Sequence, residues 1–358
     1  MAKTLEELRN NIDELDAKIQ KLITNRALLA QEVAEVKKKT GSTVAFYRPE
    51  REAQVLRKIK ERNEGVLPDN NMAHIFREIM SACLALEQKL KVAYLGPEGT
   101  FTQEASFKHF GNAVSGVDCP TIDKIFIEVD KGNANYGVVP IENSTNGVIG
   151  ATIDMLWTTN LEICGEVEIE VHHQLMSQDI NQEIKVIYAH QQAFDQSRRW
   201  LENHYPNAEL KAVASNALAA RMAKDEKNTA AIASQYALSL YGLERIAKNI
   251  EDNIGNTTRF LVLGKESIGK SDKDKTSILV TTKHQAGALF DLLEPFKQLE
   301  INIFQLARHP ISGIKWEYLF LVDFAGHKED TQVIKALNLV EKKVSKLKVL
   351  GSYPVCVL

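Results

Sequence analysis

The first ninety residues alternate apolar and polar positions with the period of an α-helix. Apolar residues recur every three or four positions from Leu5 to Val36, which predicts one long helix with a core-facing apolar stripe. Two breaks, KKTGST and GVLPD, separate it from a second helix beginning near Pro49 and a third beginning at Asp69. Residues 1–90 are therefore predicted to be entirely helical.

At Lys91 the pattern changes to short β-rich runs that alternate with helical ones. Runs such as KVAYL, YGVVPI and TRFLVL flank helical segments such as FTQEASFKHF, which is typical of an α/β domain with ligands at the carboxyl ends of its strands. The polar stretch GKESIGKSDKDK, residues 264–275, is predicted to be a linker or a long loop. After it the runs follow an approximate β-α-β-β-α-β order, which predicts a ferredoxin-like plait of the α+β class.

Composition and charge then narrow the class of protein. The chain has 358 residues, 25% of them charged, a net charge of −3 and four cysteines. These values exclude disordered, collagen-like and disulfide-scaffold proteins and predict two or three domains. The charge gives no reason to bind nucleic acid or an anionic membrane. The scattered cysteines fit reduced thiols, and no segment resembles a signal peptide or a membrane span, so we expect a cytoplasmic protein.

Charged residues interrupt the apolar faces of the predicted helices. Arg26 occupies an apolar slot, and Lys37 lies eleven residues later, only about 20° around the helix and roughly 16 Å along it. Arg51 and Glu52 border the apolar face of the second helix, and Glu87 that of the third. A helical interior lined by cations can bind a small polycarboxylate. The spacing alone leaves a second explanation open, a buried salt-bridge network, which is the commoner case.

Four segments, LRNNIDELDAKI, NRALLAQEVAEVKK, YRPEREAQVL and FREIMSACLALEQ, resemble the all-helical chorismate mutases. The resemblance implies a set of chorismate-binding side chains, namely Arg9, Arg26, Lys37, Arg51, Glu52 and Glu87. Lys37 and Glu87 would be catalytic, and Glu87 would donate a hydrogen bond to the ether oxygen as its bond breaks. Since only a protonated carboxyl can donate, we expect mutase activity to favour lower pH.

Arg9 lies 17 residues before Arg26, which places it about 25 Å away along the same helix and some 100° around it. It cannot share a pocket with Arg26 within one chain, so a second chain must supply it. The resemblance implies the same arrangement, because these mutases form intertwined dimers in which the partner's first helix completes each pocket. We therefore expect a homodimer.

Three polar loops adjoin predicted strands of the α/β region. YLGPEGTF (94–101) places two glycines and Thr100 after a strand, where backbone N–H groups and a hydroxyl can hold an anion. VVPIENSTNG (138–147) fits a helix N-cap with a turn as well as it fits a cluster of ligands. NTTRF (256–260) ends a loop as a strand begins. Because the chain lacks a GxGxxG or P-loop sequence, no nucleotide cofactor is expected.

Together these loops resemble prephenate dehydratases in order and approximate spacing, from about Lys91 to Gly264. The resemblance implies a two-lobed α/β domain of the periplasmic-binding-protein type that uses no cofactor and no metal. Thr258 would be the general acid that protonates the departing hydroxyl group. The implied substrate-binding residues are Thr100, Glu142, Asn143, Ser144, Thr145, Gln196, Thr258, Arg259 and Phe260.

Residues 276–358 resemble ACT regulatory domains, which bind phenylalanine at a dimer interface. The segments GAL and GSYP carry this resemblance, whereas the family's second effector motif, usually ESRP, reads ARHP here. The implied effector-binding residues are Gly287, Ala288, Leu289, His309 and Pro310. Because the acidic residue of the motif is missing, we expect phenylalanine inhibition to be weak or to use different contacts.

The resemblances divide the chain into a helical mutase domain (1–90), an α/β dehydratase domain (91–267) and an α+β ACT domain (275–358). They predict a homodimeric, cofactor-free enzyme of phenylalanine biosynthesis that converts chorismate through prephenate to phenylpyruvate and responds to phenylalanine. Two rival functions are a binding protein without chemistry and a mutase fused to a dehydrogenase. A sensor does not need the converging charges of the helices, and a dehydrogenase needs a dinucleotide motif that the chain lacks.

Overall fold

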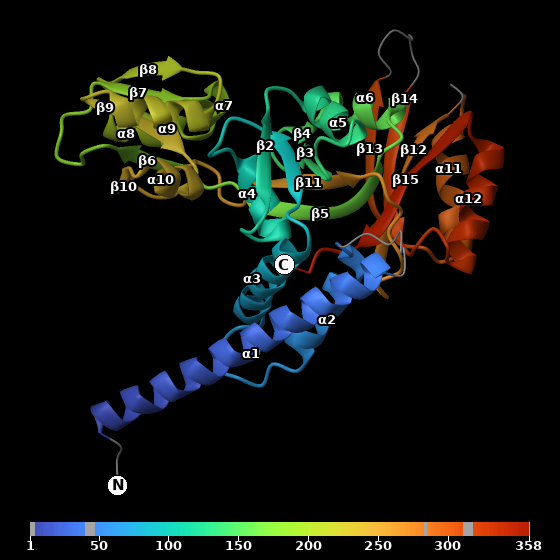
Figure 1. Cartoon of the computed structure of the whole chain (residues 1–358). Helices are drawn as coiled ribbons and strands as arrows, with labels where there is room; N and C mark the ends of the chain where they lie inside the picture. Colours follow the sequence, from blue (N-terminus) through green and yellow to red (C-terminus); the bar gives the residue numbers. More distant parts are fainter. Residues whose placement is uncertain (1–3, 40–46, 283–284, 311–317, 358) are drawn as a thin grey trace.

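The computed structural model describes residues 4–39, 47–282, 285–310 and 318–357. Figure 1 shows three parts along the chain: a helical arm, a two-lobed α/β body, and a C-terminal sheet covered by two helices. The arm projects away from the body, and most of its first helix points into open space.

The helical arm consists of α1 (Leu5–Lys39), α2 (Pro49–Glu61) and α3 (Asp69–Glu87), so the predicted helices are confirmed. The core of the arm is small and lies between α2 and α3 around Leu56 and Ile59. With 35 residues, α1 is roughly 50 Å long and extends beyond the two shorter helices that could cover it.

The apolar stripe of α1 is therefore exposed over most of its length within one chain. Its exposed members are Leu5, Leu8, Ile12, Leu15, Ile19, Leu22, Leu29, Val33 and Val36. The prediction that this stripe faces a core is wrong for the single chain. The periodicity identifies an apolar face, but it does not say whether that face packs within the same chain.

The first lobe of the body is a mixed sheet in the order β2-β1-β3-β11-β5, with the short β4 (Gly147–Val148) beside β3. Its other strands are β1 (Lys91–Leu95), β2 (Ser115–Cys119), β3 (Tyr136–Asn143), β5 (Glu162–Glu170) and β11 (Thr257–Gly264). Its helices are α4 (Phe101–Phe110), α5 (Ile122–Asp130) and α6 (Gly150–Thr158). Successive strand residues such as Val138 and Val139 pack into different cores, one containing α4 and the other containing α5 and α6.

The second lobe is a five-stranded sheet in the order β10-β6-β9-β7-β8. Its strands are β6 (Gln174–Ser177), β7 (Val186–Ala189), β8 (Glu209–Ala212), β9 (Thr229–Ala233) and β10 (Glu244–Ala247). Its helices are α7 (Gln191–Gln196), α8 (Arg198–His204), α9 (Asn216–Asp225) and α10 (Gln235–Tyr241). The chain enters this lobe after β5 and returns before β11, and the two crossings are joined by a hydrogen bond from Val171 N to Asn256 O at 2.7 Å.

The C-terminal part has the predicted β-α-β-β-α-β order and an antiparallel sheet in the order β13-β14-β12-β15. Its elements are β12 (Asp274–Thr281), α11 (Ala288–Gln298), β13 (Ile303–Pro310), β14 (Tyr318–Ala325), α12 (Thr331–Lys343) and β15 (Lys346–Pro354). Ile278 and Val280 pack under the two helices, whereas Leu279 between them packs into the first lobe beside α6. Alternate residues of one strand thus build two different cores.

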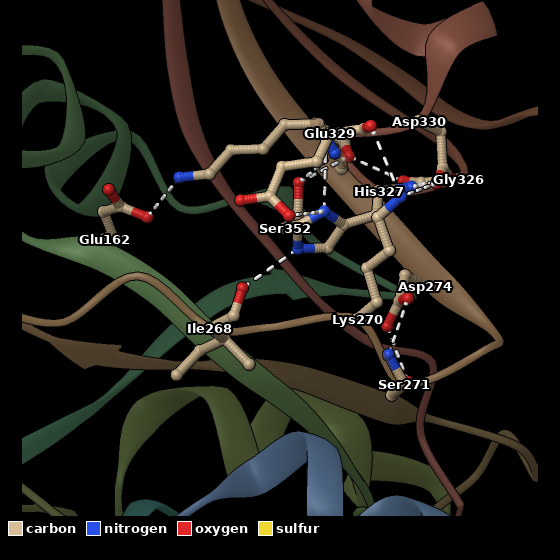
Figure 2. Close-up of polar contacts among 12 residues, drawn as sticks. Glu162, Ile268, Lys270, Ser271, Asp274, Gly326, His327, Glu329, Asp330 and Ser352 are labelled. Atoms are coloured by element: carbon tan, nitrogen blue, oxygen red, sulfur yellow. Dashed lines mark hydrogen bonds and ion pairs between the residues drawn. The ribbon is translucent and has the colours of Figure 1, made fainter. Parts of the chain in front are cut away.

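Of the polar stretch 264–275 predicted as a linker or long loop, residues 265–273 are irregular, whereas Gly264 ends β11 and residues 274–275 begin β12. The irregular part is docked onto the C-terminal part (Figure 2). His327, which is buried, donates from Nε2 to Ile268 O at 2.9 Å, and Lys270 pairs with Asp330 at 2.7 Å. Lys328 Nζ reaches Glu162 Oε2 on β5 at 2.8 Å. These contacts attach the C-terminal sheet firmly to the first lobe.

Candidate functional sites

Asn143 joins the ends of two neighbouring strands where the lobes meet. It is the last residue of β3, and it pairs with Thr258, the second residue of β11. Its amide nitrogen donates to Thr258 Oγ1 at 2.9 Å and to Asn256 Oδ1 at 2.8 Å. Asn143 and Asn256 are buried, whereas Thr258 is half-buried. The structure thus brings the second and third polar loops of the sequence together.

Asn256 also holds the loop that follows β3. The hydroxyls of Ser144 and Thr145 donate to its Oδ1 at 3.4 and 3.3 Å. The backbone N–H of Thr145 donates to Asn143 Oδ1 at 3.1 Å, so the loop is also an Asx-type turn, as its sequence allowed. Asn256 was not among the predicted site residues, although it is the first residue of NTTRF and that position was the available signal.

Gln196 brings the second lobe to this group. Its Oε1 accepts hydrogen bonds from Asn256 Nδ2 at 3.3 Å and from His173 Nε2 at 2.8 Å. Burial lowers the pKa of His173, so the imidazole is neutral and its proton lies on Nε2. Gln196 Nε2 is buried without a hydrogen-bond partner among the residues that the structure describes. The amide therefore has a buried donor that makes no hydrogen bond within the described part of the chain.

Thr100 lies in the remaining predicted loop and acts there as a helix cap. Its hydroxyl donates to Leu95 O at 2.7 Å and accepts from Gln103 N at 3.4 Å, at the start of α4. The loop itself faces the second lobe, because Tyr241 OH donates to Glu98 O at 2.8 Å. Thr100 therefore shapes the loop, and its hydroxyl is already occupied by backbone groups.

A β-bulge on β3 lies between the residues that pair with Arg259 and with Phe260. Arg259 pairs with Glu142 while Phe260 pairs with Pro140, which leaves Ile141 as the extra residue of β3. Because successive strand residues point to opposite faces, Glu142 and Arg259 point away from the face that carries Asn143 and Thr258.

Glu142, Arg259 and Phe260 are accordingly not gathered with the other predicted substrate residues. Arg259 Nε lies 2.9 Å from Glu166 Oε2, and its Nη2 lies 2.6 Å from Asp323 Oδ2 in the C-terminal part. Phe260 is buried in the core beneath α4. The pairing of Arg259 with a carboxylate more than sixty residues away could not be read from the sequence.

The predicted mutase residues are spread along the helical arm. Arg26, Lys37 and Glu87 are half-buried, whereas Arg9 and Arg51 are exposed. Because α1 is one continuous helix, Arg9 stays about 25 Å from Arg26 along its axis. The single chain therefore assembles only part of the predicted pocket.

Glu52 forms an ion pair that the sequence did not reveal. Its Oε1 lies 3.3 Å from the Nε of Arg77, a buried residue of α3. Burial raises the pKa of Glu52, and the charge of Arg77 partly offsets that rise. In the single chain the helical interior thus contains the buried salt bridge that was the alternative to a carboxylate site.

Two family models match the chain: chorismate mutase type II over residues 8–88 and prephenate dehydratase over residues 92–268. A bifunctional chorismate mutase/prephenate dehydratase of Pseudomonas aeruginosa is 48% identical over 359 residues, which cover 99% of this chain and 98% of the relative. The chain belongs to the bifunctional chorismate mutase/prephenate dehydratases. It is an enzyme of phenylalanine biosynthesis that rearranges chorismate to prephenate and converts prephenate to phenylpyruvate.

Two solved structures resemble about three quarters of the enzyme. A prephenate dehydratase from Arthrobacter aurescens in complex with L-Phe is 29% identical, with a TM-score of 0.67 over 74% of this chain and 90% of that chain. GqqA, a quorum quenching acylase, is 25% identical, with a TM-score of 0.67 over 75% of this chain and 98% of that chain. The same fold thus occurs in a dehydratase and in an acylase, so the fold alone does not assign the activity. The full-length relative and the match of the helical region assign it.

The predicted effector residues of the enzyme occupy two elements. Gly287 caps α11 with a φ of +84°, and Ala288 and Leu289 begin that helix. His309 lies near the end of β13, where its Nε2 is 3.1 Å from Asp154 Oδ1 of α6. Pro310 ends β13. His309 therefore contacts the first lobe.

Within the part of the chain that the structure describes, no three His, Cys, Asp or Glu side chains gather as metal ligands would. In the same residues, no helix has both the length and the apolarity needed to cross a bilayer.

Proposed function

We propose that dehydration of prephenate takes place at the group formed by Asn143, Asn256, Thr258 and Gln196. The observation that carries this proposal is the 2.9 Å hydrogen bond from Asn143 Nδ2 to Thr258 Oγ1. A hydroxyl that accepts a hydrogen bond from an amide keeps its own proton for a second partner. Thr258 can therefore direct that proton toward a substrate hydroxyl.

The step needs one proton donor and places to hold two carboxylates. Thr258 gives its proton to the departing hydroxyl, which leaves as water, while the ring carboxylate leaves as carbon dioxide. The electron pair of the broken C–C bond completes the aromatic ring, and a solvent proton restores Thr258. Aromatisation drives the reaction, so the protein mainly orients the substrate.

The cations for the substrate carboxylates come from the second lobe in this proposal. Arg259 is paired with Glu166 and Asp323, so it is not available to the substrate. A cavity of about 250 Å³ between the lobes is lined by Arg245 and Lys248, and also by Glu104 and Glu170. Arg245 Nη2 donates to Gln235 Oε1, and among the residues that the structure describes neither Arg245 nor Lys248 forms an ion pair, so we propose that these two cations bind the substrate carboxylates.

A time course with purified enzyme and chorismate tests the dehydratase site. In the unmodified enzyme we expect prephenate to appear transiently and phenylpyruvate to follow. Thr258→Val keeps the shape of the side chain but removes the hydroxyl, so prephenate should accumulate at an unchanged rate of chorismate consumption. Thr258→Ser restores the hydroxyl and should recover turnover. Normal phenylpyruvate formation by the valine variant would contradict the site.

The mutase site, in our proposal, is completed by a second chain. The exposed apolar stripe of α1 is long enough to bury against a partner's α1, and burial of that stripe would stabilise a homodimer. The partner's Arg9 would then join Arg26, Lys37, Arg51 and Glu87 around chorismate. Glu52, paired with Arg77 in the single chain, would meet the substrate hydroxyl beside that pair.

We assign the chain to three domains with boundaries at 1–90, 91–267 and 275–358, of which the last is an ACT domain that binds phenylalanine. Its β-α-β-β-α-β order and its place after the dehydratase body support this assignment, as does the L-Phe complex of the Arthrobacter aurescens relative. Isothermal titration with phenylalanine tests it, with tryptophan as the control ligand. Absence of heat with phenylalanine would contradict effector binding.

A further inference from the structure

The C-terminal domain contacts the first lobe at the residues next to the Asn143–Thr258 pair, on the opposite face of the sheet. Arg259, the residue after Thr258, inserts its guanidinium between Glu166 of β5 and Asp323 of β14, at 2.9 and 2.6 Å. Its Nη2 also lies 3.2 Å from the hydroxyl of Tyr353 on β15. Arg259 is buried, so its position is set by these partners and not by solvent.

Gln305 of β13 bridges β3 and β11 from the side of the C-terminal domain. Its Oε1 accepts a hydrogen bond from Arg259 Nη1, and its Nε2 donates to Glu142 Oε2 at 2.5 Å. Glu142 and Arg259 are cross-strand partners, and each is one residue away from Asn143 or Thr258, which are also cross-strand partners. The side-chain amide of Gln305 thus connects Glu142 with Arg259, the pair next to the proposed site.

The partners of Arg259 are themselves held in place. Asp323 is fully buried, and its Oδ1 accepts from Ser277 Oγ at 2.6 Å. Glu166 is held by Lys275 Nζ at 2.7 Å. The two cations and two carboxylates balance in charge, and a balanced, hydrogen-bonded cluster in a buried place has few alternative arrangements.

We propose that Gln305 and Asp323 are positioning residues of the dehydratase centre: they hold Glu142 and Arg259 and thereby set the geometry of Thr258 against Asn143. This inference rests on the proposed assignment of the dehydratase site. It makes the C-terminal domain part of the scaffold of that site. The alternation of side chains along β3 and β11 allows both functions, because it turns one pair of residues toward the proposed site and the next pair toward the C-terminal sheet.

The same strand also contacts the far end of the loop that follows β3. His309 lies 3.1 Å from Asp154, and its ring occupies the space that a Cβ on Gly150 would need. Strand β13 therefore contacts residues on both sides of this loop. Gln305 contacts Glu142, which precedes the loop, and His309 contacts Asp154, which follows it.

The test uses the full-length enzyme, in which mutase turnover reports on the helical arm and urea unfolding reports whether the body of a variant is folded. Gln305→Met keeps the length of the side chain but loses both hydrogen bonds, and Asp323→Asn removes the charge. For both variants we expect kcat with prephenate to fall about tenfold or more, with KM and mutase kcat unchanged. Lys335→Gln, an exposed residue on α12, is the matched control and should retain full dehydratase activity.

A double-mutant cycle separates positioning from a general loss of packing. If Gln305 acts through Glu142, Gln305→Met combined with Glu142→Gln should be no slower than the slower single variant. Unchanged dehydratase kcat in Gln305→Met, with Thr258→Val inactive, would overturn the positioning role and leave the site standing. Unchanged turnover in Thr258→Val would overturn the site, and the positioning role with it. If Asp323→Asn also loses mutase activity, the kinetics of Gln305→Met alone decide whether the positioning role holds.

Discussion

The polar side chains around Thr258 are held mainly by hydrogen bonds to a shared amide oxygen and not by ion pairs. Asn256 Oδ1 accepts from Asn143, Ser144 and Thr145, and its amide nitrogen donates to Gln196 across the lobe boundary. One amide group therefore links both lobes and both motif loops. Such a group is costly to remove, since its partners are left without a hydrogen bond in a largely buried place.

Substitution of Asn256 should separate orientation from binding. Asn256→Ala removes the shared acceptor, so we expect kcat for prephenate to fall about tenfold or more. Asn256→Asp keeps the acceptor but places a negative charge beside a dicarboxylate substrate, so KM should rise while kcat is largely kept. Steady-state kinetics with prephenate measure both. Equal effects of the two variants would show that Asn256 only supports the fold.

Glu87 offers a test of the mutase chemistry at the same scale. A carboxyl donates a hydrogen bond only when protonated, whereas an amide donates at every pH. Glu87→Gln should therefore keep mutase activity at high pH, where the unmodified enzyme loses it. Chorismate consumption between pH 5 and pH 9 measures the profile. Identical profiles would mean that Glu87 does not act as the donor.

At the scale of the elements, local patterns predicted more than long-range pairings did. The three helices of the arm and the β-α-β-β-α-β order were predictable because periodicity and breakers are local properties. The ion pairs of Arg259 were not, because Glu166 and Asp323 lie on strands that are distant from it in the sequence. The partner of Glu52 was missed for a similar reason, since Arg77 belongs to another helix.

Helix α1 makes the dimer proposal testable by complementation. Arg9→Ala and Lys37→Ala should each abolish mutase activity, because each removes a cation from every pocket. When the two variants are mixed and exchange subunits, each mixed dimer should contain one intact pocket, so about a quarter of the mutase activity should return. Chorismate turnover measures it, with dehydratase activity as the control. No recovery after confirmed subunit exchange would show that the pocket lies within one chain.

At the scale of the whole molecule, His109 lies where the arm, the first lobe and the C-terminal segment meet. Burial, with a contribution from the charge of Arg77, lowers the pKa of His109 to about 3. Tyr47 OH lies 3.1 Å from its Nε2. The folded enzyme thus holds this histidine neutral, whereas the unfolded chain takes up a proton below about pH 6.5.

Stability should therefore fall as the pH decreases. The folded pKa is depressed, so the contribution of His109 is fully present above about pH 6.5 and is lost at up to about 1.4 kcal/mol per pH unit below it. His109→Gln should reduce this dependence between pH 6.5 and pH 4.5, as measured by urea unfolding at a series of pH values. His204→Gln, at an exposed position, should not. An unchanged slope in the His109 variant would contradict the argument.

The order of the strands also has a consequence for folding during synthesis. Strand β11 lies between β3 and β5, yet it is made after the entire second lobe. While the ribosome is still translating residues before Thr257, the first lobe lacks an interior strand, and β5 has no partner on that side. The second lobe is built from one continuous stretch of chain and can complete its sheet first. A nascent chain should therefore carry a folded second lobe beside an unfinished first one.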